Sequence, residues 1–176
     1  MEGLMPRVYV SIGSNIARER NIRAAVAALR EQFTALALSP VYRTPAEGFV
    51  GDDFYNLVAA FDTDLPLEAL AERLAAIEAA QGRRRDGPRF GPRTLDIDVL
   101  LYGDLVRHDA RFDIPRDDIA LYAHVLGPLA ELAPDLAHPE TGERFGELWR
   151  RFPGNKALRR VPFDFDVRER GRMRRG

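Results

Sequence analysis

The sequence predicts an α+β domain whose elements follow the order strand, helix, strand, strand, helix, strand. Two observations favour this order. Four extended segments are bounded by Gly, Pro and polar residues, and two segments between them carry apolar residues at helical spacing. The order is that of the ferredoxin-like, or split βαβ, fold, an antiparallel sheet with both helices on one face. We therefore expect the other face to be left for a ligand.

The first strand and the first helix meet at a short polar segment. Residues 7–13 are expected to form the strand, and residues 22–33 carry the apolar stripe of the helix. Ser14 and Asn15 are candidate N-caps, because short polar side chains accept hydrogen bonds from the first N–H groups of a helix. The helix is thus expected to begin close behind the strand.

The next two extended segments cover residues 36–43 and 54–63 and enclose a polar, glycine-containing loop. This loop is long for a plain hairpin, and such loops are often functional. Pro66 opens the second helix, whose apolar residues recur at helical spacing through residues 67–78. The fourth strand is expected over residues 95–101.

After Gly103 the chain is expected to form a C-terminal strand and helix appendage. Residues 108–115 can form a short extended pair, and residues 119–132 have a helical pattern. A further short helix is expected through residues 148–149. Residues 166–176 are rich in arginine and are expected to be a disordered tail.

Composition limits the class of protein. With 176 residues, of which 45% are hydrophobic, the chain suits a single globular domain. A formal net charge of −1 is unlike that of a non-specific nucleic-acid binder, and the lack of cysteine excludes thiolate chemistry. The sequence shows neither a membrane-spanning stretch nor a signal-peptide pattern. We therefore expect a cytoplasmic protein with no nucleic-acid or membrane partner.

The most informative motif is the pair Asp96 and Asp98 in the last predicted strand. Because side chains alternate along a strand, both carboxylates point to the same face, with Cα atoms about 6–7 Å apart. This separation suits carboxylates that share Mg2+ ions, which prefer oxygen ligands. The opposite face of the strand is apolar and is expected to contain Leu95, Ile97, Val99 and Leu101.

An arginine-rich loop, residues 82–92, precedes the aspartates. Arginine binds phosphate, and aspartate binds the Mg2+ that phosphates carry. The combination predicts a nucleotide polyphosphate held between the loop and the strand. The alternative is that the aspartates lie on the solvated face of an edge strand.

The most specific segment of the chain is Gly91-Pro92-Arg93-Thr94-Leu95-Asp96-Ile97-Asp98. It is accompanied by Ile12-Gly13-Ser14-Asn15, Tyr42-Arg43-Thr44-Pro45, Asn56 and Glu78-Ala79-Ala80-Gln81-Gly82-Arg83. Together these segments, within roughly residues 7 to 140, resemble the 6-hydroxymethyl-7,8-dihydropterin pyrophosphokinase family of folate biosynthesis.

The resemblance implies an enzyme that transfers the β,γ-pyrophosphoryl group of ATP to the hydroxymethyl group of the pterin and releases AMP, with two Mg2+ ions. Residues 1–165 would form one pyrophosphokinase domain, acting as a monomer on small-molecule substrates. The implied catalytic residues are Arg83, Arg93, Asp96 and Asp98, and the two aspartates would hold the metal. The implied ATP-binding residues are Glu78, Arg83, Arg85, Arg93, Ile97, Arg111 and Arg116. The implied pterin-binding residues are Thr44, Pro45, Phe54, Asn56, Asp96 and His124.

The chain departs from the family pattern after residue 110. Arg116 stands at a family histidine, Tyr122 at a family arginine and His124 at a second aromatic that stacks on the pterin. Phe90 replaces a family tryptophan. Arg116 can take over a phosphate contact and His124 can still stack, whereas the loss of the arginine would weaken ATP binding.

Two alternative functions stay open at this point. A catalytically weakened relative would bind nucleotide or pterin without turnover, and a ferredoxin-like sheet can also bind single-stranded RNA. The aspartate pair disfavours RNA, because carboxylates repel phosphate. Single residues also have plainer interpretations: Thr44 and Pro45 as a strand end, Asn56 as a polar strand residue, and Glu78 as a solvated helix end.

Overall fold

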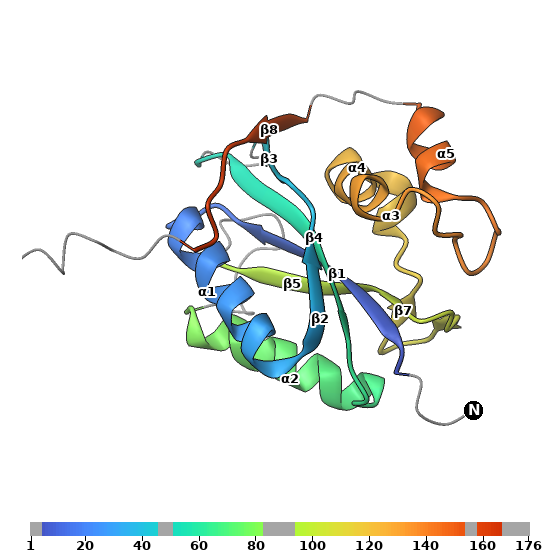
Figure 1. The fold of residues 1–176 in the computed structure, drawn as a ribbon, viewed down its shortest axis with the longest axis horizontal. Helices are drawn as coiled ribbons and strands as arrows, with labels where there is room; N and C mark the ends of the chain where they lie inside the picture. The colour runs from blue at the N-terminus through green and yellow to red at the C-terminus, as the bar shows by residue number, and fades with distance from the viewer. Residues whose placement is uncertain (1–4, 46–50, 83–93, 154–157, 167–176) are drawn as a thin grey trace, which may run out of the picture.

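The computed structural model describes residues 5–45, 51–82, 94–153 and 158–166, and an antiparallel sheet lies at its centre (Figure 1). Its strands are β1 (Arg7–Ser14), β2 (Thr34–Leu38), β3 (Val41–Thr44), β4 (Phe54–Asp62), β5 (Asp96–Tyr102) and β8 (Arg159–Val161). Their order is β5-β1-β4-β3-β8, and β2 also pairs with β4. The mixed α/β class with an antiparallel sheet is as predicted, and β1 lies between β4 and β5.

The main hydrophobic core fills the space between one face of the sheet and two helices, α1 (Arg18–Gln32) and α2 (Leu67–Ala80). Alternate residues of β1, such as Val10 and Ile12, are fully buried there. The apolar stripe of α1, including Ile22 and Leu29, packs against them. Helical spacing and strand alternation thus meet in one core, as the sequence predicts.

The other face of the sheet carries a second, smaller core. It is formed with α3 (Asp118–Leu121), α4 (Ala123–Leu132) and α5 (Phe145–Arg150), which lie on the side away from α1 and α2 (Figure 1). Val58 of β4 packs in this cluster with Leu126 and Leu129 of α4. The expectation that this whole face is left for a ligand is therefore wrong, because α4 covers the part around Val58.

A β-bulge in β5 changes which residues face the second core. Tyr9 of β1 pairs with Leu101 and Val10 pairs with Val99, so Leu100 is an extra residue on β5. Beyond the bulge the alternation is inverted, and Leu101 packs in the second core with Leu100. The prediction that Leu101 shares a face with Leu95, Ile97 and Val99 is therefore wrong.

The expected strand over residues 36–43 is two strands, β2 and β3, interrupted at Ser39 and Pro40. Pro40 has no N–H to donate to a sheet. Ser39 instead makes two bonds to Val58: its N–H donates to the carbonyl oxygen (2.9 Å), and its hydroxyl accepts from the N–H (2.9 Å). These two bonds attach the interruption to β4.

Ser14 and Asn15 do not cap α1. The N-cap residue is Ala17, which has a left-handed backbone conformation (φ 43°) and makes no side-chain capping bond. Ser14 and Asn15 are both buried and bind other segments, as described below. The helix therefore begins later than the polar residues suggest.

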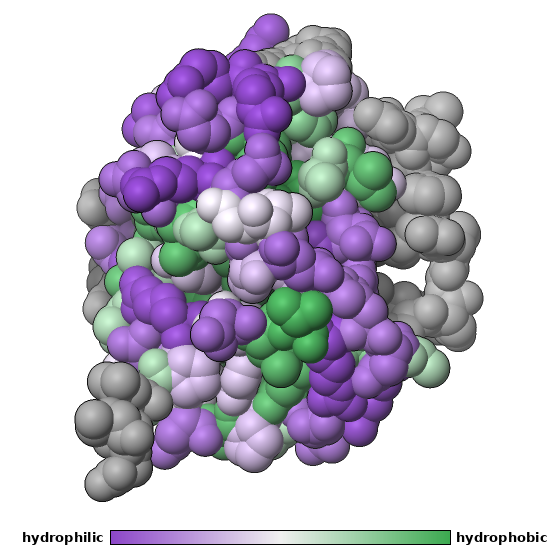
Figure 2. Space-filling model, turned by 90° about the vertical axis from the view of Figure 1, so that its right-hand side faces the viewer, coloured by the Kyte–Doolittle hydropathy of each residue, from purple (hydrophilic) through white to green (hydrophobic). Residues whose placement is uncertain are grey.

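The appendage contains the predicted extended pair, β6 (Arg107–His108) and β7 (Asp113–Ile114), which form an antiparallel ladder. The helix expected over residues 119–132 is divided at Tyr122 into α3 and α4. The outer surface on this side of the molecule is mainly hydrophilic, with small hydrophobic areas between (Figure 2). Across the described ranges, each helix is too short or too polar to cross a membrane.

The chain returns to the sheet after the appendage. Residues 159–161 form β8, which pairs antiparallel with β3, and this strand was not predicted. Asp166, placed at the start of the tail by the sequence, forms an ion pair with Arg30 of α1 (2.8 Å). Residues 167–176, the rest of the predicted tail, lie outside the described residues.

Candidate active site

Three neighbouring strands place a row of site residues side by side. Gly13 of β1 pairs with Asn56 of β4 on one side and with Asp96 of β5 on the other. Directly paired residues point to the same face of a sheet. Asn56 and Asp96, which lie 40 positions apart in the sequence, therefore flank a glycine on one face.

Gly13 keeps this row open. A Cβ atom at this position would lie 2.8 Å from Oδ1 of Asn56, which is inside van der Waals contact. A larger residue would displace the amide of Asn56 and fill the strip of sheet between Asn56 and Asp96. The glycine thus leaves room for a flat ligand over the sheet.

The Asn56 side of the row is ordered by hydrogen bonding. Its Nδ2 atom donates to Oγ1 of Thr44 (2.7 Å), and Thr44 pairs with Phe54 in the β3–β4 ladder. Tyr42 pairs with Asn56 in the same ladder, and burial, followed by the Glu131 carboxylate, raises the pKa of its hydroxyl. Thr44, Phe54 and Asn56 therefore share one face, and the sheet brings these predicted pterin residues together.

The Asp96 side of the row continues to Asp98. Ser11 of β1 pairs with Asp98, so both aspartates lie on the face of Gly13 and Asn56, as the alternation predicts. Ser11 also pairs with Val58 of the second core. The site thus ends where the second core begins, with Asp98 next to the boundary.

The aspartate pair suits a cation that receives its remaining ligands from a substrate. The two carboxylates supply oxygen donors, which Mg2+ prefers. Within residues 5–45, 51–82, 94–153 and 158–166, they do not form part of a cluster of three or more His, Asp or Glu side chains. A metal bound here would therefore need ligands beyond such a cluster, and phosphate oxygens are well suited to that role.

Glu78, at the end of α2, supports β5 from the core side. It is buried (2% exposed), so its interpretation as a solvated helix end is wrong. Its Oε2 atom accepts a hydrogen bond from the backbone N–H of Ile97 (2.7 Å). Ile97 separates the two aspartates, and its side chain belongs to the main core. Glu78 thus binds the backbone between the two carboxylates.

Arg116 brings a positive charge to the aspartate strand. Its backbone N–H donates to the Leu100 carbonyl at the bulge (3.0 Å), and its Nε atom donates to Asp118 (3.0 Å). Burial by itself would lower the pKa of Arg116, but the charge of Asp98 and the bond to Asp118 raise it. Arg116 therefore lies within electrostatic reach of Asp98.

The other predicted site residues are distributed as follows. His124 lies at the start of α4, where its ring stacks on that of Tyr122 (5.4 Å between centroids). Arg111 lies in the turn between β6 and β7, with its guanidinium 5.3 Å from the centroid of the Phe112 ring. Pro45 follows β3 directly. Arg83, Arg85, Phe90 and Arg93 lie outside the described residues.

Sequence reasoning missed a set of side chains that bind the segment before Phe54. Asn15 donates to the carbonyl oxygen of Asp52 (3.1 Å), and Arg18 donates to that of Asp53 (2.7 Å). Arg43 forms an ion pair with the Asp53 carboxylate (2.9 Å). The available signal was that Asn15 and Arg18 are polar residues between the apolar strand β1 and the apolar stripe of α1. The same polarity is equally typical of helix caps and of charged surface residues.

A hollow of about 370 Å3 lies beside this set, at the start of α1. Its described lining comprises Asn15, Ala17, Arg18, Glu19, Arg20 and Asp52. Neither aspartate of the pair lines it, so it is distinct from the row over Gly13. Ser14, which is fully buried, donates to the carbonyl oxygen of Thr94 (2.5 Å) and so attaches the end of β1 to the start of β5.

The sequence is similar to the members of one protein family. The profile of a family described as 7,8-dihydro-6-hydroxymethylpterin-pyrophosphokinase matches residues 9–134. A Pseudomonas aeruginosa protein named 2-amino-4-hydroxy-6-hydroxymethyldihydropteridine pyrophosphokinase is 41% identical over 163 residues, covering 90% of this chain and 99% of its own length. A Methylorubrum extorquens protein of the same name is 41% identical over 136 residues, covering 75% and 85%.

Solved structures agree at the level of the fold. The chain matches a crystal structure of Plasmodium falciparum HPPK-DHPS A437G with a TM-score of 0.68 and 11% identity, over 84% of this chain. A second crystal structure of that protein matches with a TM-score of 0.69 and 12% identity, over 86% of this chain. The match covers 43% and 46% of those longer chains, so this chain spans less than half of their length.

Proposed function

Because the chain belongs to the 7,8-dihydro-6-hydroxymethylpterin-pyrophosphokinase family, we propose how its residues perform the family's reaction. The chain is a pyrophosphokinase that uses ATP. It transfers the β,γ-pyrophosphoryl group to the hydroxymethyl group of 6-hydroxymethyl-7,8-dihydropterin and releases AMP. The observation that carries the assignment of the site is the row of Asn56, Gly13 and Asp96 on one face of the sheet, with Asp98 beside it.

The pterin binds on the Asn56 side of this row. Its planar ring fits over Gly13, where the sheet carries no side chain. The amide of Asn56 and the hydroxyl of Thr44 offer hydrogen bonds to the polar edge of the ring, and Phe54 offers an aromatic face. Pro45 and His124 complete the set of pterin contacts.

The triphosphate of ATP binds on the aspartate side. Asp96 and Asp98 would hold two Mg2+ ions, which when bound neutralise charge on the phosphoryl oxygens. Asp96 also faces the pterin. Arg83, Arg85, Arg93 and Arg116 add positive charge, of which Arg116 is attached to β5 through Leu100. Glu78, Ile97 and Arg111 complete the set of ATP-binding residues.

The protein contributes mainly alignment and electrostatics. The attacking hydroxyl belongs to the pterin and the leaving group is AMP, so the transfer requires no covalent enzyme intermediate. The sheet fixes Asn56 and Asp96 on the two strands that flank β1, so that a pterin over Gly13 presents its hydroxymethyl group toward the aspartates. Arg83 and Arg93 stabilise the negative charge that develops during transfer.

Several finer features belong to the same proposal. Residues 1–165 form one domain with a ferredoxin-like core and a C-terminal appendage, and the chain works as a cytoplasmic monomer. The two substrates meet on one chain, because the pterin and phosphate residues come from strands of a single sheet.

Phosphorus NMR tests the reaction. Purified protein is incubated with ATP, Mg2+ and 6-hydroxymethyl-7,8-dihydropterin, with parallel samples that lack pterin or contain EDTA. We expect AMP and a pterin diphosphate, both dependent on pterin and on metal. Formation of ADP would contradict pyrophosphoryl transfer, and a folded protein without turnover would favour the catalytically weakened relative.

A further inference from the structure

We infer that the C-terminal strap, defined as residues 159–166, positions the pterin-binding end of β4 from the opposite face of the sheet, with Phe163 as the positioning residue. The inference rests on the proposed function for what Phe54 and Asn56 bind. The strap begins as β8, in which Arg159 pairs with Arg43 and Val161 with Val41 of β3. It therefore borders the strand that carries Thr44.

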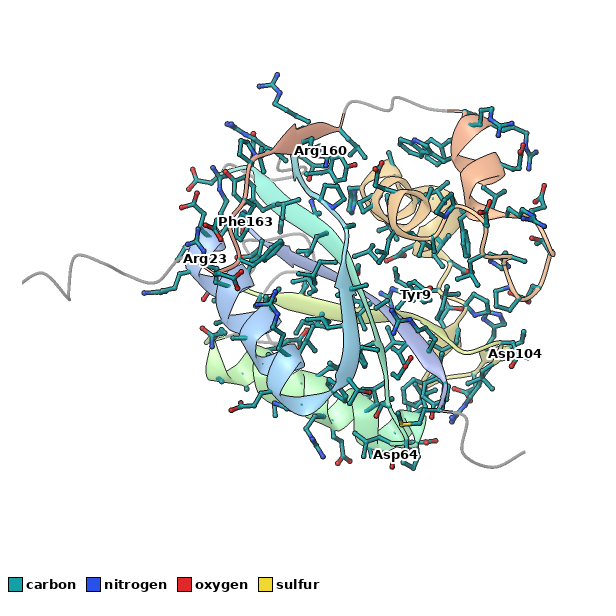
Figure 3. The ribbon with its side chains drawn as sticks, viewed as in Figure 1. Tyr9, Arg23, Asp64, Asp104, Arg160 and Phe163 are labelled. Carbon is teal, nitrogen blue, oxygen red and sulfur yellow. The ribbon has the colours of Figure 1, made fainter. Side chains whose placement is uncertain are left out.

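Beyond β8 the strap lies along α1. The guanidinium of Arg23 lies 4.9 Å from the centroid of the Phe163 ring, and its Nε atom donates to the Asp164 carbonyl (2.8 Å). Asp166 pairs with Arg30, about two turns further along the helix. Figure 3 shows Phe163 next to Arg23, where the strap meets α1. Phe163 is thus held in place by the helix.

Phe163 contacts the strand residue that separates the two pterin contacts. Tyr55 lies between Phe54 and Asn56, so its side chain points to the opposite face, where it is 8% exposed within the main core. The Phe163 ring meets the Tyr55 ring edge to face, with centroids 6.2 Å apart and planes at 79°. Aromatic pairs favour this geometry.

Arg18 connects Tyr55 to the residue before Phe54. Its guanidinium lies 4.1 Å from the centroid of the Tyr55 ring, a cation–π contact, and it donates to the Asp53 carbonyl (2.7 Å). Because that carbonyl belongs to the peptide group between Asp53 and Phe54, the backbone on both sides of Phe54 is held from behind. Removal of the Phe163 ring releases one side of Tyr55.

The expected consequence is specific to one substrate. A loosened Tyr55 lets Phe54 and Asn56 move, but Asp96 and Asp98 lie on β5, which is separated from β4 by β1. We therefore expect Phe163→Ala to raise the KM for the pterin about three- to tenfold at saturating ATP. The KM for ATP at saturating pterin should change less than twofold.

Phe165→Ala is the matched control. Phe165 also belongs to the strap and packs against the main core, and it contacts Phe163 (4.8 Å between ring centroids). Both variants remove a phenyl ring and should lower the melting temperature. A purely structural strap predicts the same pterin KM in both variants, whereas a positioning role predicts a larger increase for Phe163→Ala.

Hydrogen exchange gives a readout that does not depend on turnover. Amides of residues 53–57 should exchange faster in Phe163→Ala than in Phe165→Ala, with amides of residues 96–99 unchanged. Equal exchange at residues 53–57 in both variants, or equal increases in both KM values, would overturn the inference. If the wild-type protein shows no turnover, the proposed function fails while the exchange experiment still tests the strap.

Arg18→Met is the second variant if Phe163→Ala does not fold. Methionine keeps the apolar stem but removes the charge over Tyr55 and the bond to the Asp53 carbonyl. We expect the same selective rise in pterin KM and faster exchange at residues 53–57. An unchanged pterin KM in this variant would contradict the connection from Tyr55 to Phe54.

Discussion

The two faces of the sheet are built by the same alternation of side chains but differ in composition. On the face toward α1 and α2, β1, β4 and β5 contribute apolar residues such as Ile12, Leu57 and Ile97 to one core. On the other face the same three strands contribute Gly13, Asn56 and Asp96. Stability is therefore concentrated on one face, and recognition on part of the other.

On the second face, the candidate site and the second core are separated by only a few residues along each strand. Val58 and Leu100 are each two positions from a site residue, Asn56 and Asp98, and both are buried in the second core. The difference between the faces predicts that substitutions on the first face lower stability, whereas substitutions in the row lower activity. The following predictions test that separation.

The largest effect is expected for the aspartates. Asp96→Ala or Asp98→Ala should reduce transfer by about 10^3-fold or more, because charge stabilisation by a bound metal contributes several kcal/mol. The melting temperature should stay within a few degrees, since each variant removes one of two neighbouring carboxylates. The rate is measured by AMP release, with Asp104→Ala, an exposed aspartate after β5, as the control. A folded and fully active Asp96→Ala would contradict the metal assignment.

A core substitution should show the reverse pattern. Phe61 is fully buried and stacks on Phe33 (4.2 Å between centroids), so Phe61→Ala should cost about 3–5 kcal/mol of unfolding free energy. Urea denaturation measures the loss. Both KM values should match the wild type at a temperature where the variant is folded. A selective change in either KM would show that the main core at Phe61 is coupled to the site on the other face of the sheet.

Glu78 sharpens the comparison because it acts from the core side on the site strand. Glu78→Ala leaves the Ile97 N–H without its acceptor, which should cost about 1–3 kcal/mol of stability, and should also lower kcat. Glu78→Gln keeps an acceptor oxygen, so it should recover much of both quantities. Chemical denaturation and steady-state kinetics are compared for the pair. Equal kcat values in both variants would contradict the idea that Glu78 positions the two aspartates through the Ile97 N–H. A rise in the ATP KM alone would favour a direct contact between Glu78 and ATP.

Gly13→Ala tests the row itself. The added Cβ would lie 2.8 Å from Oδ1 of Asn56, so the amide must move and its bond to Thr44 is strained. We expect the pterin KM to rise about tenfold, equivalent to about 1.4 kcal/mol. Ser11→Ala, two positions earlier on the same face, removes atoms instead of adding them and should have a smaller effect. A pterin KM equal to that of the wild type would contradict a ligand over Gly13.

The smallest effect concerns the appendage that covers the second face. Nδ1 of His108 hydrogen-bonds to Asp113, and Nε2 hydrogen-bonds to Glu140. The bond to Asp113, followed by the bond to Glu140, raises the pKa of His108 above its ordinary value of 6.5. A raised pKa means that the protonated form stabilises the fold. This contribution is complete below pH 6.5 and is lost as the pH rises through the folded-state pKa.

NMR titration of the histidines measures this shift. Burial lowers the pKa of His138, so the two residues should titrate on opposite sides of 6.5 in the same sample. The melting temperature should fall slightly as the pH rises above 6.5, and His108→Gln should lack that slope. Titration of His108 below 6.5 would contradict the bridge between Asp113 and Glu140.

Much of the first face, and the aspartate pair of the second, could be predicted from the sequence. The helical stripes of α1 and α2, the alternation in β1 and the shared face of Asp96 and Asp98 are local periodic patterns, and local patterns survive folding. The motif around the aspartates also indicated the family. The roles of Arg83, Arg85 and Arg93 stay predictions, because these residues lie outside the described residues.

The sequence by itself therefore determined the apolar stripes of the two long helices, the apolar side of the first strand and the shared face of the two carboxylates. Only the tertiary structure decided which residues meet across strands: Asn56 and Asp96 around Gly13, Glu78 on the Ile97 N–H, and Phe163 on Tyr55. It also decided the inversion at Leu100, because a bulge depends on the register of the partner strand. Such contacts join residues tens of positions apart, and a local pattern of one chain segment carries no information about them.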